Sequence, residues 1–209
     1  MADWNTHLYC AHRVNRVLQY DGKDLDMFLF GNLLPDVNMG WIIECGAHLE
    51  QADTHFDAIG QEYFWAPLRF YEKYKTEIDS EDPLFLGYLF HLWLDVSFMT
   101  DFVNRIPMSQ MISDYHNVRQ LKWKDAGLFI KEYRFPLSAE HIDDIVVHSK
   151  AIEEISITAD DLLRVVEYTN SESQEYEADE YYLYTKEEFA EFYERICCDF
   201  ISWVKNPTL

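Results

Sequence analysis

Apolar residues recur every three or four positions along most of this 209-residue chain, which is the spacing of one face of an α-helix. No stretch combines strict apolar–polar alternation with the Asn-Gly or Asp-Gly turns of β-hairpins. The pattern therefore predicts an all-α protein. Residues 84–103 are the most apolar segment, and they follow a helix-start sequence at 79–83. Because this segment is apolar on almost every side, we expect its helix to run through the middle of the fold.

Other helices are expected before and after this central one. The first is predicted from about residue 5 to residue 21, with four aliphatic side chains facing inward: Leu8, Val14, Val17 and Leu18. A short apolar segment at 27–37 contains a glycine and a proline, which predict a sharp turn near its end. Residues 38–60 have no clear period and predict a loop. Further helices are expected at about 61–78, 107–117 and 119–133.

The last third of the chain differs in composition. Residues 135–209 carry 18 acidic and 5 basic side chains, a net charge of −13, against −8 for residues 1–134. Helix starts are predicted here at Ser138, Thr158 and Thr185. The last of these is a Thr-x-x-Glu capping box, and its helix is expected to extend to about Lys205. We expect residues 1–134 to form a metal-binding helical core and residues 135–209 to pack on it as an acidic helical extension of one domain.

The chain as a whole is strongly acidic. It has 38 acidic and 17 basic side chains, a formal net charge of −21 and a pI near 4.5. Such a surface repels phosphate backbones and anionic lipid headgroups, so we expect neither a nucleic-acid partner nor stable membrane insertion. It also attracts divalent cations. Residues 167–182 are acidic, polar and rich in tyrosine, which is typical of a solvated loop; a strip that collects metal ions or binds a partner is the alternative.

The first ten residues lack the basic and apolar regions of a secretory signal, and no run approaches the about 18 apolar residues of a membrane span. We therefore expect a cytoplasmic protein. Its four cysteines lack the spacing of a disulfide framework, and we expect them to be reduced thiols: Cys10, Cys45, Cys197 and Cys198.

The candidate chemistry begins with His91 and Asp95 inside the central apolar segment. A spacing of four puts both side chains on one helical face, with Cβ atoms about 5–6 Å apart, where an imidazole and a carboxylate can hold one metal ion. A structural hydrogen bond between the two, without metal, is the alternative. Three further residues stand beside apolar stretches and offer ligand atoms suited to Zn²⁺, with Fe²⁺ or Mn²⁺ also acceptable: His7, Asp36 and His55.

Four blocks of sequence carry a resemblance to a known family. They are THLYCAHR at 6–13, FLFGNLLPD at 28–36, DTHF at 53–56 and FLGYLFHLWLD at 85–95. Together, in this order, they resemble the bacterial zinc-dependent phospholipase C family, whose wider superfamily includes the fungal single-strand nucleases. The likeness is greatest to small intracellular bacterial phospholipase-C-like hydrolases, and it covers about residues 4–134.

This resemblance implies an all-α fold that holds two or three zinc ions, binds a phosphate diester and activates a water molecule. Carried over by motif, one zinc would have the ligands Asp36, His55, His91 and Asp95. Asp95 would also bridge to a second ion, which His7 would bind. Asp36 is the residue the resemblance suggests as catalytic, holding or deprotonating the attacking water.

The resemblance also implies a third ion, but fewer of its ligands match the family's motif. Asp101 stands where the family has a histidine six residues after the bridging aspartate, and His116 and Asp125 are the nearby residues for the remaining pair. Replacement of histidine by carboxylate shifts the preference of such a site toward Mn²⁺ or Mg²⁺.

Two functional hypotheses follow. The first is a metal-dependent hydrolase that cleaves a phosphate ester, a phosphodiester or phospholipid-like molecule, with a metal-activated water. The second is a phospholipase-C-like protein that has kept a structural metal without turnover and acts as a binding or interaction module. A metal-free helical protein, in which His91 and Asp95 satisfy each other, is a third.

Overall fold

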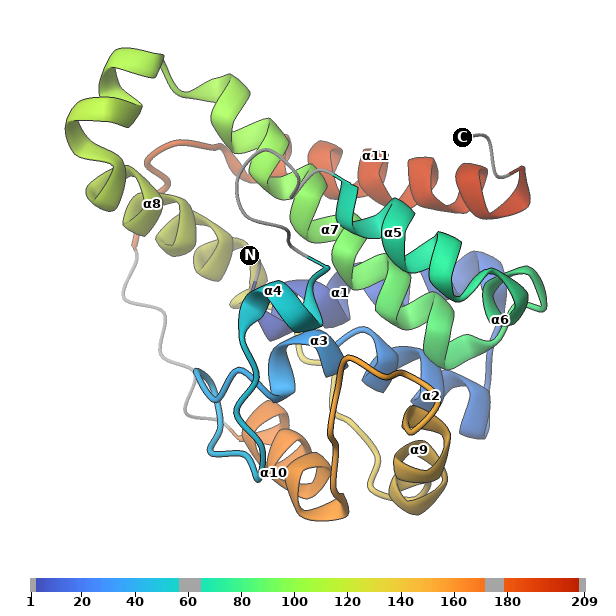
Figure 1. The fold of residues 1–209 in the computed structure, drawn as a ribbon. Helices are drawn as coiled ribbons and strands as arrows, with labels where there is room; N and C mark the ends of the chain where they lie inside the picture. Colours follow the sequence, from blue (N-terminus) through green and yellow to red (C-terminus); the bar gives the residue numbers. More distant parts are fainter. Residues whose placement is uncertain (1–2, 57–64, 172–178, 207–209) are drawn as a thin grey trace.

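The computed structural model describes residues 3–56, 65–171 and 179–206, and in these segments the chain forms helices joined by loops, without a strand (Figure 1). The prediction of an all-α protein is confirmed for this part of the chain. The helices are α1 (Trp4–Leu18), α2 (Gly22–Gly31), α3 (Leu34–Val37), α4 (Gln51–Thr54), α5 (Ala66–Lys73), α6 (Lys75–Asp79), α7 (Pro83–Arg105), α8 (Met108–Ile130), α9 (Ile142–Ser149), α10 (Ala159–Asn170) and α11 (Lys186–Lys205).

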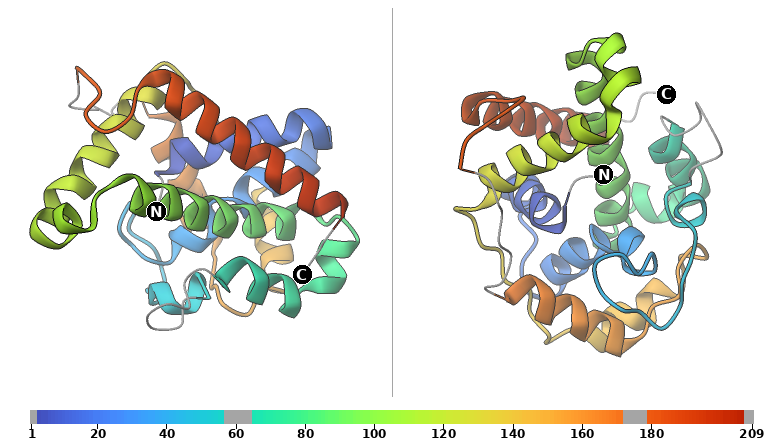
Figure 2. Two further views of the ribbon diagram at one scale, coloured as in Figure 1. Left: turned by 90° about the horizontal axis from the view of Figure 1, so that it is seen from above. Right: turned by 90° about the vertical axis from the view of Figure 1, so that its left-hand side faces the viewer.

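Helix α7 runs through the middle of the molecule, as its apolar sequence predicts. It begins at Pro83, after Asp82 caps it by accepting hydrogen bonds from the N–H groups of Leu84 and Phe85. Residues 84–92 are all buried. Helices α1, α2, α5 and α11 pack around α7 (Figures 1 and 2). The side chains of residues 84–92 therefore lie in the interior from whichever face of α7 they project.

The crossing of α2 and α7 is unusually close because each helix has a glycine there. A Cβ atom on Gly87 would overlap the carbonyl oxygen of Phe28, and one on Gly31 would overlap the carbonyl oxygen of Leu84. Asn32 follows at once and donates from its side chain to the carbonyl oxygen of Gly87 at 3.2 Å. The two glycines thus bring the backbone at the end of α2 within hydrogen-bonding distance of α7.

Helix α8 returns alongside the second half of α7 (Figure 1). The sequence predicted two helices, at 107–117 and 119–133. The structure has two helical stretches within α8, as predicted, but they meet at a kink at Asp114, whose backbone angles (φ −149°, ψ 36°) are not helical, and the second ends at Ile130.

The carboxy-terminal third shares its core with the rest of the chain. Ile145 and Phe189 belong to the same buried apolar cluster as Leu8 and Phe90. Polar contacts add to this packing: His148 Nε2 lies 2.7 Å from the second oxygen of the α7 cap, Asp82. The predicted capping boxes at Thr158 and Thr185 are both present, and they start α10 and α11.

Several local predictions need correction. Val17 is 48% exposed rather than inward-facing, because nine residues of helix turn it to the side opposite Leu8. The segment predicted as one helix at 61–78 contains two, α5 and α6, separated at Tyr74; residues 61–64 lie outside the described part. The helix predicted to begin at Ser138 begins at Ile142 instead.

The four cysteines are free thiols, in agreement with the prediction. Within the described segments, no helix combines the length and the apolar character that crossing a membrane requires.

Candidate metal centre

Five of the side chains predicted as metal ligands converge in the interior. His7 comes from α1, Asp36 from α3, His55 from the residue that ends α4, and His91 and Asp95 from the middle of α7. Their exposed fractions are 0, 4, 0, 0 and 1% respectively. Helices α1 and α3 both contact α7, and α4 contacts α3, so the four segments that carry these side chains lie together although they are distant in sequence (Figure 1).

Three of the ligand atoms form one compact group. His55 Nε2 lies 3.1 Å from His91 Nε2 and 3.3 Å from Asp36 Oδ1, and His91 Nε2 lies 3.8 Å from Asp36 Oδ1. Asp95 Oδ2 lies 3.8 Å from His55 Nε2 and 3.7 Å from His91 Nε2. A zinc ion with bonds of about 2.0–2.1 Å would separate tetrahedral ligand atoms by about 3.3 Å. Asp36, His55 and His91 therefore suit a single zinc ion, and Asp95 is the candidate for its fourth ligand.

A second group of potential ligands adjoins the first. His7, His91 and Asp95 have ligand atoms within 4.8 Å of one another, and His7 Nε2 lies 3.5 Å from Asp95 Oδ1. Asp95 thus directs Oδ2 toward the first set and Oδ1 toward His7, which is the arrangement of a bridging carboxylate. The rings of His7 and His91 are stacked with their centroids 4.0 Å apart. Since the Nε2 lone pair of His91 serves one ion only, a second ion would have His7 and Asp95 as its described ligands.

The backbone of Asn32 sets the orientation and tautomer of His91. His91 Nδ1 lies 2.9 Å from the carbonyl oxygen of Asn32, which can only accept a hydrogen bond. In the neutral ring the proton is therefore assigned to Nδ1, and the lone pair of Nε2 faces the other ligands. His55 is oriented similarly: its Nδ1 lies 2.9 Å from Thr54 Oγ1.

The charges of the cluster favour a bound cation. Burial lowers the pKa of His91 to about 3, so the ring is neutral and can act as a ligand. Burial opposes the ionisation of Asp36, but the neighbouring imidazoles of His91 and His55 hold its pKa below the usual value. Asp36 Oδ1 and both ring nitrogens of His7 are buried without a hydrogen-bond partner in the described structure. Two buried carboxylates beside the neutral ring of His91 carry negative charge that a divalent ion would neutralise.

Asp101, predicted to ligate a third ion, lies outside both groups. It is six residues beyond Asp95 on α7, and its carboxylate accepts hydrogen bonds from Tyr184 Oη and Arg195 Nη2, each at 3.2 Å. This carboxylate joins α7 to α11 and the segment before it.

The other two residues predicted for the third ion also have different surroundings. Asp125 is buried and accepts backbone hydrogen bonds from residues 182–184 at 2.6–2.9 Å, so both its oxygens are engaged. His116 is exposed on α8, and its Nε2 lies 2.9 Å from Gln120 Nε2. The structure therefore does not bring Asp101, His116 and Asp125 together.

Some residues that complete the centre were not predicted. Trp4 donates from Nε1 to Asp36 Oδ2 at 3.2 Å, which leaves Oδ1 directed toward His55. Asn32 acts through its backbone carbonyl, which has no signature in the sequence. Thr54 is adjacent to His55 in the chain, and that adjacency is the signal that could have suggested its role.

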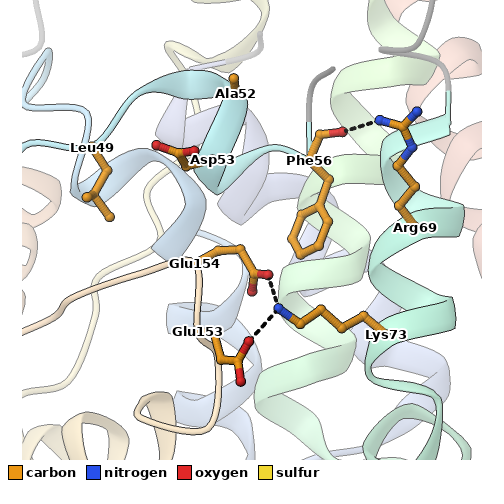
Figure 3. Close-up of a pocket in the computed structure, with 8 residues that line it drawn as sticks. All are labelled: Leu49, Ala52, Asp53, Phe56, Arg69, Lys73, Glu153 and Glu154. Carbon is orange, nitrogen blue, oxygen red and sulfur yellow. Dashed lines mark hydrogen bonds and ion pairs between the residues drawn. The ribbon is translucent and has the colours of Figure 1, made fainter.

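An open pocket of about 690 Å³ adjoins the segment that carries His55 (Figure 3). Asp53 and Phe56, on either side of Thr54 and His55, both line it. On the opposite wall Lys73 pairs with Glu153 and Glu154, while Arg69 donates to the carbonyl oxygen of Phe56 at 3.2 Å. The cationic side chains of the pocket are thus engaged by partners within it.

Comparison with protein-family models, with curated proteins and with solved structures finds no match to this chain. The resemblance to the zinc-dependent phospholipase C family stays a prediction, and the geometry of the site is interpreted on its own terms.

Proposed function

We propose that this protein is a metal-dependent hydrolase of a phosphate ester, with a phospholipase-C-like helical fold. The observation that carries the proposal is the convergence of buried ligand atoms: Asp36, His55 and His91 lie within 4.8 Å of one another, Asp95 Oδ2 lies 3.7–3.8 Å from both imidazoles, and His7 adjoins Asp95. Zinc suits this mixed nitrogen and oxygen set, and Mn²⁺, Fe²⁺ or Mg²⁺ are the alternatives.

The two groups of ligands suggest a division of roles. The first offers four protein atoms, which is the complete set of a structural zinc site, whereas His7 and Asp95 alone would leave positions for water and substrate at a second ion. Divalent ions there would neutralise phosphate oxygens and lower the pKa of a bound water molecule. Among the protein groups, Asp36 is the proposed residue that holds or deprotonates the water, and the hydrogen bond from Trp4 fixes its carboxylate.

The proposed substrate is a small or lipid-like phosphate ester. The formal net charge of −21 disfavours a polyanionic nucleic acid and an anionic lipid surface, because both are repelled at long range. A soluble intracellular phosphodiester is the substrate class that agrees with this charge and with the expected cytoplasmic location.

The test is to measure metal content and turnover together. Protein purified without chelator or nickel affinity should contain one to two Zn, Mn or Fe atoms per chain and should hydrolyse bis(p-nitrophenyl) phosphate. Asp95→Asn should remove at least one ion and abolish turnover, because Asp95 reaches both ligand groups. Asp161→Asn is the matched control: Asp161 is also a buried carboxylate, but it caps α10. A protein without metal, or with full metal content and no turnover on any phosphate ester, would refute the hydrolase.

A structural metal in a non-catalytic binding module is the second candidate. One observation favours it: the five ligand side chains are at most 4% exposed, which is typical of a closed structural site. It predicts one ion per chain, no turnover, and a large loss of stability in Asp95→Asn because metal binding is coupled to folding.

A further inference from the structure

Lys122 is a buried lysine on α8 that the proposed chemistry has not yet used. It is 2% exposed, and its ammonium group lies 3.9 Å from the ring centroid of Phe98 and 4.6 Å from that of Phe102. In the described part of the chain its Nζ forms neither a hydrogen bond nor an ion pair. Lysine is almost never fully buried unless it is paired, so this position requires an explanation.

The ammonium group lies against the helical face that carries Asp95. Phe98 and Phe102 follow Asp95 on α7 by three and seven residues, so they continue the face of the helix that carries this carboxylate. Three residues of helix rise about 4.5 Å, which places Phe98 about one turn from Asp95. Lys122 also interacts electrostatically with the carboxylates of Asp95 and Asp101. Its charge therefore acts on one of the two ligands proposed for the second ion.

The protonation state suits the binding of an anion. The pKa of Lys122 is lowered to about 8. Burial is the main cause and Arg119 adds to it, while the attraction of Asp95 opposes both. In the metal-free protein the group is therefore still mostly protonated at neutral pH. A positive charge held among aromatic rings, with little water, attracts an anion more strongly than a surface lysine does.

We propose that Lys122 binds the phosphate group of the ester and positions it against the ion at His7 and Asp95. This inference rests on the proposed function and adds a specificity-determining residue to it. The ligand class is a phosphate monoanion or dianion with at least two free oxygens, one for each cation.

The experiment is the binding of inorganic phosphate to metal-loaded protein, measured by isothermal titration calorimetry. Lys122→Met keeps the volume of the side chain and removes the charge, and Lys122→Arg keeps the charge. Lys124→Met is the matched control, because Lys124 is exposed on the same helix. We expect Lys122→Met to retain its metal and its helical circular dichroism while binding phosphate about tenfold or more weakly, as expected for a lost charged hydrogen bond. Lys122→Arg should recover most of the affinity, and Lys124→Met should bind as the unchanged protein does.

Two results would overturn the inference: unchanged phosphate affinity in Lys122→Met, or no phosphate binding by the fully metal-loaded protein. Hydrolysis of bis(p-nitrophenyl) phosphate, measured on the same samples, separates this inference from the proposed function. Lys122-dependent phosphate binding without turnover would refute the hydrolase and support the anion site. Turnover with the same KM in Lys122→Met would support the hydrolase and refute the role of Lys122.

Discussion

Replacing Lys122 by methionine should stabilise the metal-free protein at neutral pH. The folded structure lowers the pKa of Lys122 from 10.5 to about 8, and a shift of about 2.5 units corresponds to about 3 kcal/mol in favour of unfolding. Methionine fills the same space without a charge, although the cation–π contacts with Phe98 and Phe102 are lost, at about 1 kcal/mol. The net gain in unfolding free energy at pH 7 should be about 2 kcal/mol.

The difference in unfolding free energy between Lys122→Met and the native protein should depend on pH. Below pH 8 Lys122 is protonated in both the folded and the unfolded states, and the folded state carries the whole cost of burying the charge. Between about pH 8 and 10.5 the unfolded state binds more protons than the folded state, so the stability conferred by the native lysine rises with pH. The advantage of Lys122→Met should therefore shrink across this interval and disappear above it.

The assay is urea unfolding of both proteins in chelator, at intervals from pH 7 to pH 11. Tyrosines and cysteines also titrate in this range, but they are common to both proteins and cancel in the difference. Two parallel stability curves, or a Lys122→Met variant that is less stable at pH 7, would show that the ammonium group is paired or solvated in the folded protein and would refute the reasoning.

Three further predictions concern the metal and the packing around it. Removal of metal by a chelator should lower Tm, because an ion present at about 100 times its Kd contributes about 2.7 kcal/mol to folding; a Tm unchanged by chelator and by added zinc would contradict a bound ion. Gly87→Ala should destabilise the protein by about 1–3 kcal/mol or more in urea unfolding, because the new Cβ overlaps the backbone of α2, whereas an unchanged midpoint would mean that the crossing relaxes at little cost. Asp125→Asn should cost about 3 kcal/mol, since residues 182–184 lose a charged acceptor, while metal content stays the same; a loss of metal would return Asp125 to the centre.

The fold could be predicted where local signals were strong. The continuous apolar character of 84–103 and the proline at its start predicted α7 correctly, and the capping threonines predicted α10 and α11. The failures concern features set by tertiary packing or by a single residue's backbone angles. Periodicity predicted a break between residues 117 and 119 but not its position at Asp114, and it did not show that Val17, on the side of α1 opposite Leu8, stays exposed.

The candidate site divides in the same way. The spacing of His91 and Asp95 suggests a metal site but also allows a metal-free hydrogen bond, and the sequence blocks of the resemblance suggest all five ligands. The carbonyl group of Asn32 is not recognisable, because every residue has one and only the close crossing of α2 and α7 brings this one to His91. Lys122 lies in a polar stretch typical of a helix surface, and its burial arises from the way α8 packs on α7.

The burial of the ligands has a consequence for how the ion is acquired. His7, Asp36, His55 and the pair on α7 come from segments that meet only when the helices have packed, and each is at most 4% exposed once they have. An ion would therefore enter while the chain is folding or during a local opening, and it would leave at the rate of that opening. The identity of a bound metal would then depend on which ion was available while the protein folded. Exchange in the folded protein would be slow even where another ion binds more tightly.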